Sequence, residues 1–134
     1  VVAFFSDVAY WETWLVKWEE KWGGDYVIKA TEKTMIGFDM RGNLKEITLS
    51  NESLMKAIMD GVISHDGDFR LRRHVLNTRR RHNKWGVSFG KEGRESSRKV
   101  DGYAAMLLAY MAAIKVRLKK DRKPKKKPGR SFFM

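Results

Sequence analysis

The chain has 134 residues, of which 43% are hydrophobic and five are tryptophan, which favours one folded domain over a disordered chain. Because it contains no cysteine, a disulfide framework and a thiolate zinc site are both excluded. No apolar run approaches the ~20 residues that span a bilayer, and residues 1–5 lack the basic leader of a signal peptide. The sequence starts without methionine inside an apolar run, so we expect a fragment or a processed product.

The net charge of +12 is divided very unevenly between the two halves of the chain. Residues 1–68 carry seven Lys or Arg against twelve Asp or Glu, whereas residues 69–134 carry twenty-one against four. A basic half of this size predicts a polyanionic partner, with nucleic acid ahead of a membrane surface. The alternative is a solubilising tail together with a solvated helix face.

The first expected elements are a strand and a helix. Residues 1–6 are a continuous apolar run, which predicts a central strand buried on both faces and ending at Asp7. In residues 10–22 four tryptophans recur at spacings of three, four and four, which places them on one helical face. We interpret that face as core because the opposite face is polar; stacking on bases is the alternative. Gly23-Gly24 is expected to end the helix through a positive φ.

Between residues 26 and 61 the pattern predicts three strands and a second helix. Residues 35–39 and 44–49 resemble a hairpin around Arg41-Gly-Asn43, on which Asp39 is an exposed residue. The remaining expectations are a strand over 26–30, a helix capped by Ser50 or Asn51 that runs through Met59, and a stop at Gly61.

In the basic half, Asp68 is expected to cap a helix over residues 69–77. A basic run over 79–84, a short strand over 85–89 and a charged loop lead to Ser97, the expected cap of the final helix. That helix has no charged residue from Gly102 to Ile114, which predicts that it is mostly buried, with Asp101 in its first turn.

The composition changes after Ile114. Residues 115–130 hold ten basic residues, one acidic residue and two prolines, which cannot bury a core. We therefore expect a domain over residues 1–114 and a basic flexible tail over residues 115–134.

Two aspartates are the candidate catalytic and metal-ligating residues. A buried strand would fix Asp7 and a buried helix would fix Asp101, and carboxylate oxygens suit Mg²⁺ or Mn²⁺. Two-metal hydrolysis of a phosphodiester needs such carboxylates with basic groups nearby. The alternative for Asp101 is that it complements the helix dipole. The expected DNA contacts are Arg79, Arg80, Arg81, Lys84 and Lys99, and His74 is a possible contact to a phosphate or a catalytic carboxylate.

Three segments resemble the C-terminal nuclease region of tailed-phage large terminase subunits, most closely the forms in phages of actinobacteria. They are residues 65–81 (HDGDFRLRRHVLNTRRR), residues 85–91 (WGVSFGK) and residues 94–109 (RESSRKVDGYAAMLLA). The resemblance covers most of residues 1–114. It implies an α/β fold of the ribonuclease-H type, a mixed sheet flanked by helices, here incomplete at its N-terminal strands.

The resemblance also implies a function. The family uses three acidic residues and two Mg²⁺ or Mn²⁺ ions to cut concatemeric double-stranded viral DNA during packaging in the host cytoplasm. Its last two acids correspond to Asp101 and Asp7, whereas Asp39 lies at the wrong place in the order to be the first acid. The chain also lacks the phosphate-binding loop of the family's ATPase. Partners implied by the family are the portal protein and the small terminase subunit. Whether this chain cleaves DNA is left open, and a non-catalytic basic DNA-binding module is the alternative.

Overall fold

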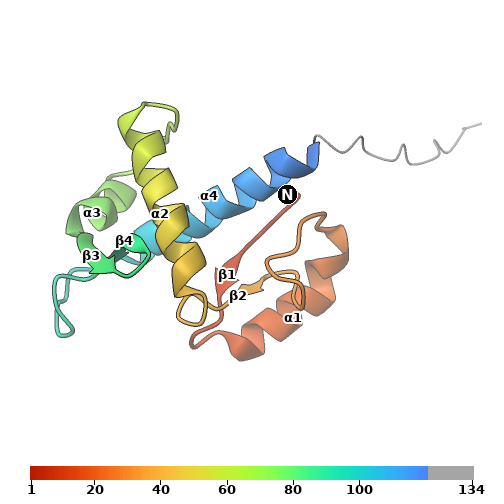
Figure 1. Ribbon diagram of the computed structural model, residues 1–134. Helices are drawn as coiled ribbons and strands as arrows, with labels where there is room; N and C mark the ends of the chain where they lie inside the picture. Colours follow the sequence, from red (N-terminus) through yellow and green to blue (C-terminus); the bar gives the residue numbers. More distant parts are fainter. Residues whose placement is uncertain (121–134) are drawn as a thin grey trace, which may run out of the picture.

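The computed structural model describes residues 1–120, and it combines four α-helices with two short sheets in that part of the chain (Figure 1). The elements in chain order are β1 (Ser6–Asp7), α1 (Glu12–Trp22), a 3₁₀ helix η1 (Gly23–Asp25), β2 (Gly37–Phe38), α2 (Leu44–Met59), α3 (Phe69–Asn77), β3 (Arg79–Asn83), β4 (Gly86–Gly90) and α4 (Asp101–Lys120). The expected mixture of helix and strand is therefore present. The strands form two separate pairs, β1 parallel to β2 and β3 antiparallel to β4, so the described residues contain no larger mixed sheet.

The hydrophobic core lies between α4, α2 and the N-terminal segment. On α4 the buried side chains recur at helical spacing and form one face, while Ala105, Ala109 and Ala113 on another face are exposed. The expectation that α4 is mostly buried is thus correct for one face only. Each fully buried leucine contributes about 1.5–3 kcal/mol relative to exposure. The buried members of the cluster include Phe5, Phe38, Leu54, Tyr103, Leu107, Leu108 and Met111.

A buried asparagine connects three elements around this core. The Asn51 side chain on α2 donates through Nδ2 to the carbonyl oxygen of Val87 on β4 at 2.8 Å. Its Oδ1 accepts from the hydroxyl of Tyr103 on α4 at 2.6 Å. Burial raises the pKa of the Tyr103 phenol above its ordinary value of 10.0. Asn51 is therefore an interior side chain of α2, and the expectation that it caps a helix is wrong.

The expected N-terminal strand is largely absent. Only Ser6 and Asp7 pair with β2, and Val1, Val2 and Phe4 are exposed, so a strand buried on both faces is wrong. The expected strand over 26–30 is also absent, although the Val2 carbonyl accepts from the backbone N–H of Val27 at 2.9 Å. These backbone contacts hold the N-terminal segment beside residues 27–28 without forming a regular sheet.

The hairpin expected over residues 35–49 is wrong as well. Residues 44–49 belong to α2, and β2 pairs in parallel with β1 instead. The buried positions Ile47, Asn51 and Leu54 are spaced by four and three, so one helical period continues through the stretch that we divided into strand and helix. Asp39 is exposed as expected, but its Oδ1 accepts from Arg41 and Gly42 in the turn that leads into α2.

The tryptophan face of α1 is not a core. Trp11, Trp14 and Trp22 are 49%, 52% and 39% exposed, and Leu15 is the buried residue of the helix. The rings pack on one another, with Trp11 stacked on Trp18 at a centroid distance of 6.1 Å. The amphipathic spacing identified the helix correctly, but the residues that pack against its aromatic face, such as Phe4 beside Trp18, leave most of that face exposed.

Local signals at turns and caps give mixed results. Gly61 ends α2 with φ +66°, and Asp68 caps α3 with the bounds that the sequence predicts. Gly23 has φ −57° and begins η1, so the positive φ expected there is wrong. Ser97 is also not a cap, because α4 starts at Asp101 and the Val100 carbonyl accepts its first backbone bonds.

The final helix extends beyond Ile114, where the sequence suggested that the tail begins. It runs to Lys120, and two of its lysines are tied to the N-terminal half. Lys115 donates to the Ala30 carbonyl at 2.8 Å and Lys119 donates to the Val27 carbonyl at 2.7 Å. The rest of the expected tail, residues 121–134, lies outside the described residues. Within residues 1–120, no helix is both long and apolar enough to cross a membrane.

Candidate nucleic-acid interface

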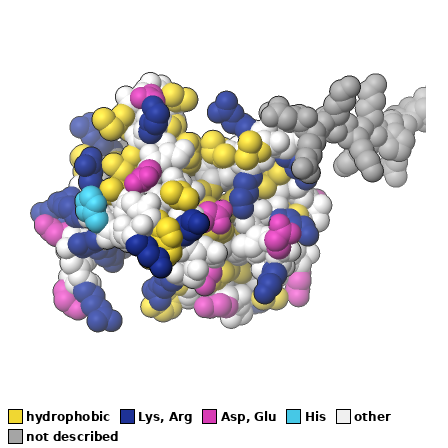
Figure 2. All heavy atoms as spheres, viewed as in Figure 1, with side chains coloured by type: hydrophobic (Ala, Val, Ile, Leu, Met, Phe, Trp, Pro, Cys, Tyr) yellow, Lys and Arg dark blue, Asp and Glu magenta, His cyan; other side chains and the backbone are white. Residues whose placement is uncertain are grey.

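The basic residues from Arg70 to Lys99 lie on the elements around the start of α4. Figure 2 shows Lys and Arg side chains concentrated on the side of the molecule that carries α3 and the β3–β4 hairpin. This face, which we call the basic face, comprises α3, the β3–β4 hairpin and the loop over residues 91–99. Its exposed cationic residues are Arg70, Arg72, Arg73, Arg80, Arg81, Lys84, Lys91, Arg94, Arg98 and Lys99.

The three consecutive arginines of β3 have different environments. Arg79 is half-buried and donates to the carbonyl oxygens of Leu76 and Thr78 at 2.9 and 3.3 Å. Arg81 donates to the carbonyls of Lys91 and Glu92, which anchors the 91–99 loop to the hairpin. Both guanidiniums therefore support the local fold. Arg80 alternates with them along the strand and is exposed, and its guanidinium makes no hydrogen bond or ion pair to another residue of the described part.

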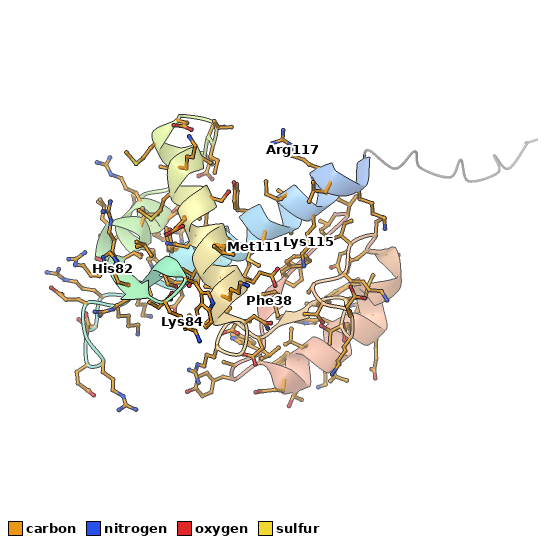
Figure 3. The ribbon with its side chains drawn as sticks, in the orientation of Figure 1. Phe38, His82, Lys84, Met111, Lys115 and Arg117 are labelled. Atoms are coloured by element: carbon orange, nitrogen blue, oxygen red, sulfur yellow. The ribbon has the colours of Figure 1, made fainter. Side chains whose placement is uncertain are left out.

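The hairpin turn presents Lys84 at the tip of the basic face. Lys84 is exposed, and its ammonium lies 4.4 Å from the centroid of the Trp85 ring (Figure 3). The turn requires a glycine at residue 86, which has φ +136° and whose backbone passes close to the Glu52 carboxylate. That carboxylate accepts from the Val87 backbone N–H at 2.8 Å. Helix α2 thus fixes the hairpin and the position of Lys84.

His74 and Asn77 on α3 hold the start of α4. His74 Nδ1 accepts from the Gly102 backbone N–H at 2.7 Å, so the proton of the neutral ring is on Nε2. A Cβ at residue 102 would lie 2.8 Å from that nitrogen, which explains the glycine. Asn77 Nδ2 donates to the Lys99 carbonyl at 2.9 Å. We expected His74 to contact a phosphate or a carboxylate, and its Nδ1 instead binds the backbone next to Asp101.

Sequence reasoning missed Asn77 and Gly102 as positioning residues. Neither lies in a pattern that periodicity detects, because their partners are 22 and 28 residues away in the sequence. The only available signal for Gly102 was a glycine in the first turn of a helix, where it weakens the helix unless close packing requires it.

Asp101 and Asp7 occupy different surroundings. Asp101 is exposed in the first turn of α4, beside Lys99 of the basic face. Asp7 ends β1 as expected, is half-buried, and its Oδ1 accepts from the Met40 backbone N–H at 3.2 Å. Among residues 1–120, no three His, Asp or Glu side chains form a group that could hold a metal ion. The carboxylates present here therefore do not fit a complete two-metal site.

The acid that caps α3 is the most strongly perturbed carboxyl near the basic face. A hydrogen bond from Arg70, followed by the backbone N–H of Leu71, lowers the pKa of Asp68 from 3.8 to about 2. Asp68 Oδ2 lies 3.0 Å from the Arg70 guanidinium. This pair lies at the N-terminus of α3, so Asp68 serves the helix and offsets one of the cations of the basic face.

Comparison with known proteins gives two similar phage proteins. The chain is 33% identical over 113 residues to the Gene 13 protein of Mycobacterium phage L5 and, equally, to the Gene 13 protein of Mycobacterium phage D29. Each match covers 84% of this chain and 19% of the relative, so the chain spans about a fifth of the length of these relatives. No family model matches the chain, and no solved structure matches it. The chain is thus similar to one segment of much longer mycobacteriophage proteins.

Proposed function

We propose that this chain is part of the DNA-cutting nuclease of a phage packaging terminase and that it engages double-stranded DNA through the basic face. The observation that carries the proposal is the convergence of α3, the β3–β4 hairpin and the 91–99 loop on the first turn of α4. Exposed cations lie on these elements, and the side chains of His74 and Asn77 bind the backbone of Gly102 and Lys99 on either side of Asp101. The similarity to mycobacteriophage proteins agrees with a phage origin.

Phosphate binding follows from the charges that remain available on this face. Arg80, Lys84 and Lys99 are exposed and have no ion-pair partner in residues 1–120, so their cations can neutralise phosphates and release counterions. Arg79 and Arg81 contribute positive potential while their donors serve the fold. Such contacts position DNA without reading its sequence.

Cleavage requires ligands beyond those described here. We propose that Asp101 and Asp7 contribute carboxylate oxygens to a Mg²⁺ or Mn²⁺ site that is completed by an acidic residue of the longer protein. The fold would then be an incomplete ribonuclease-H type. The family resemblance further suggests docking to the portal protein and the small terminase subunit during phage assembly in the host cytoplasm.

The experiment that tests this function is incubation of the chain with supercoiled plasmid DNA and Mn²⁺, with EDTA and Asp101→Asn as controls. The same assay is repeated with this chain extended by the segments that lie outside the matched region in the phage relatives. We expect metal-dependent nicking by the extended chain, lost on Asp101→Asn. Nicking that persists in Asp101→Asn or in EDTA would contradict the proposal.

A non-catalytic DNA-binding module is the second candidate, and the absence of a three-residue metal group in residues 1–120 favours it. In that case Asp101 only complements the dipole of α4. The extended chain would then bind DNA in EDTA and Mn²⁺ alike, and no nicking would appear.

A further inference from the structure

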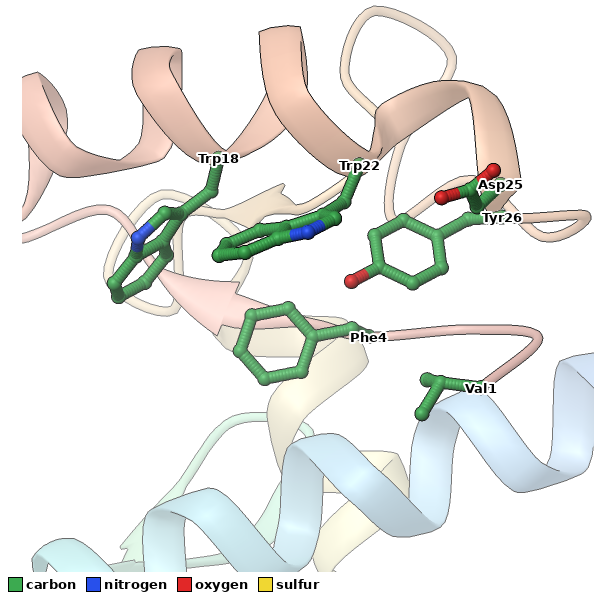
Figure 4. Close-up of a pocket in the computed structure, with 6 residues that line it drawn as sticks. All are labelled: Val1, Phe4, Trp18, Trp22, Asp25 and Tyr26. Carbon is green, nitrogen blue, oxygen red and sulfur yellow. The ribbon is translucent and has the colours of Figure 1, made fainter.

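An open aromatic pocket lies at the opposite end of the molecule from the β3–β4 hairpin. It has a volume of about 520 Å³ and is lined by Val1, Phe4, Trp18, Trp22, Asp25 and Tyr26. Figure 4 shows the rings of Phe4, Trp18, Trp22 and Tyr26 facing a common space, with Val1 below and the Asp25 carboxylate at one side. We call this site the aromatic pocket.

The walls of the aromatic pocket are too exposed to be a finished core. Phe4 is 40% exposed and Trp22 is 39% exposed. The rings already contact one another, with Phe4 and Trp18 edge to face at a centroid distance of 6.2 Å. An additional aromatic side chain placed among them would gain both burial and favourable ring contacts.

The end of α4 lies beside this pocket. Lys119 donates to the carbonyl oxygen of Val27 at 2.7 Å, and Val27 directly follows Tyr26 of the pocket wall. The chain that continues from Lys120 therefore starts close to the aromatic pocket. Eleven residues lie between Lys120 and Phe132, and an extended chain over that span reaches roughly 40 Å, which is ample for a return to the pocket.

The chemistry of residues 121–134 complements the pocket. Phe132, Phe133 and Met134 follow a stretch whose charged residues are six Lys or Arg and one Asp. Their side chains are of the kinds that pack into aromatic sites. The preceding cations suit the acidic half of the molecule, where residues 1–68 have five more acidic than basic residues and Asp25 lines the pocket itself.

We propose that Phe132 and Phe133 dock in the aromatic pocket of the same chain. The tether from Lys120 makes this contact intramolecular, with an effective concentration in the millimolar range for a short linker, so a weak site is sufficient. The basic residues between the tether and the phenylalanines add long-range attraction that falls with salt. This proposal does not depend on the proposed nuclease function.

Acrylamide quenching of tryptophan emission tests the contact, because four of the five tryptophans belong to the stripe over residues 11–22 and two line the pocket. The full chain is compared with Phe132→Ser/Phe133→Ser, which removes both rings and keeps the charge. The matched control is Met59→Ser/Val62→Ser, two exposed apolar residues near the end of α2. We expect the tryptophans of the native chain to be protected from acrylamide. This protection should be lost in the phenylalanine variant and retained in the control.

Two further measurements are needed to interpret the quenching. Helical circular dichroism establishes that all variants are folded, and sedimentation velocity over a range of protein concentrations separates docking within one chain from docking onto a second copy. Equal quenching of the native chain and the phenylalanine variant would overturn the proposal and leave the pocket to an outside partner. Protection that appears only as dimers form would also overturn it, in favour of a second copy.

Discussion

Two regions of the molecule are built on different principles. Among α2, α3, α4 and the β3–β4 hairpin, side chains tie the elements together at specific points: Asn51 joins α2 to β4 and α4, and His74 joins α3 to α4. In the N-terminal region, residues 1–43, α1 presents three tryptophans that are 39–52% exposed, and the strands are two residues long. The elements of the basic face are thus bound to one another and to α2 by specific side chains, whereas the aromatic face of α1 still offers surface to a further layer.

The largest expected effect is the difference in the free energy of unfolding between two variants of α1, one at its buried residue and one on its aromatic face. Leu15→Ala removes the buried residue of the helix and should lower the free energy of unfolding by about 2–5 kcal/mol. Trp14→Ala, although it deletes a larger side chain, should lower it by less than about 1 kcal/mol, because Trp14 is half-exposed. Urea unfolding of both variants measures the difference. Equal losses would show that α1 buries its tryptophans in solution.

A comparable effect is expected at the polar connection between α2, β4 and α4. Asn51→Ala leaves the Val87 carbonyl and the Tyr103 hydroxyl without their partner and should lower the free energy of unfolding by about 2–4 kcal/mol. The matched control is Ser53→Ala, which removes an exposed hydrogen bond to Tyr110 on the same helix and should lower it by less than about 1 kcal/mol. If the two variants unfold at the same urea concentration, Asn51 does not connect these elements.

The contact between His74 and Gly102 should give a smaller effect. Gly102→Ala places a Cβ 2.8 Å from His74 Nδ1 and should destabilise the protein by about 1–3 kcal/mol through overpacking. His74→Ala removes the obstacle, so alanine at residue 102 should then be tolerated, and a double-mutant cycle should show a coupling above about 0.5 kcal/mol. If the losses in the free energy of unfolding of the two single variants simply add in the double variant, the His74 ring does not contact residue 102.

The smallest effect concerns the cap of α3. The pKa of Asp68 in the folded protein, about 2, is lower than its ordinary value of 3.8 because of the hydrogen bond from Arg70. Its stabilising contribution is therefore fully present above about pH 4 and is lost as the pH falls towards 2. Hydrogen exchange of the α3 amides should accelerate across this interval in the native chain. Asp68→Asn retains the cap without the charge, so its exchange should change less over the same interval.

The sequence predicted those parts of the fold that local chemistry decides. Asp68 and Gly61 marked helix ends correctly, because a cap and a positive φ depend on neighbouring residues alone. The sequence prediction failed where contacts with distant residues decide the structure. Residues 44–49, for example, were predicted as a strand, but they share one helical period with the rest of α2. Within the candidate site, the sequence predicted the basic face, but it did not predict that Arg79 and Arg81 donate to backbone carbonyls while Arg80 does not. Those bonds depend on the carbonyls of Leu76 and Lys91, which no sequence pattern places beside the arginines.

The candidate metal ligands show the same distinction. The positions of Asp7 at the end of β1 and of Asp101 in the first turn of α4 were expected from local pattern, and both are present. That the two aspartates share one metal site was an expectation about tertiary structure, and in residues 1–120 no three His, Asp or Glu side chains form a group that could hold a metal ion. A further ligand is therefore the part of the proposed function that residues 1–120 do not supply.

The central claim, that the basic face binds DNA, is tested most directly by fluorescence anisotropy with a labelled duplex at several salt concentrations. The variant Arg80→Ala/Lys84→Ala/Lys99→Ala is compared with Lys29→Ala/Lys33→Ala/Lys45→Ala, which removes the same charge from exposed lysines of the acidic half. We predict that the first variant weakens binding and reduces the salt slope by about 2–3, roughly one for each lost phosphate contact, while the second leaves the slope unchanged. Equal losses in the two variants would show that net charge alone attracts DNA and would contradict the account.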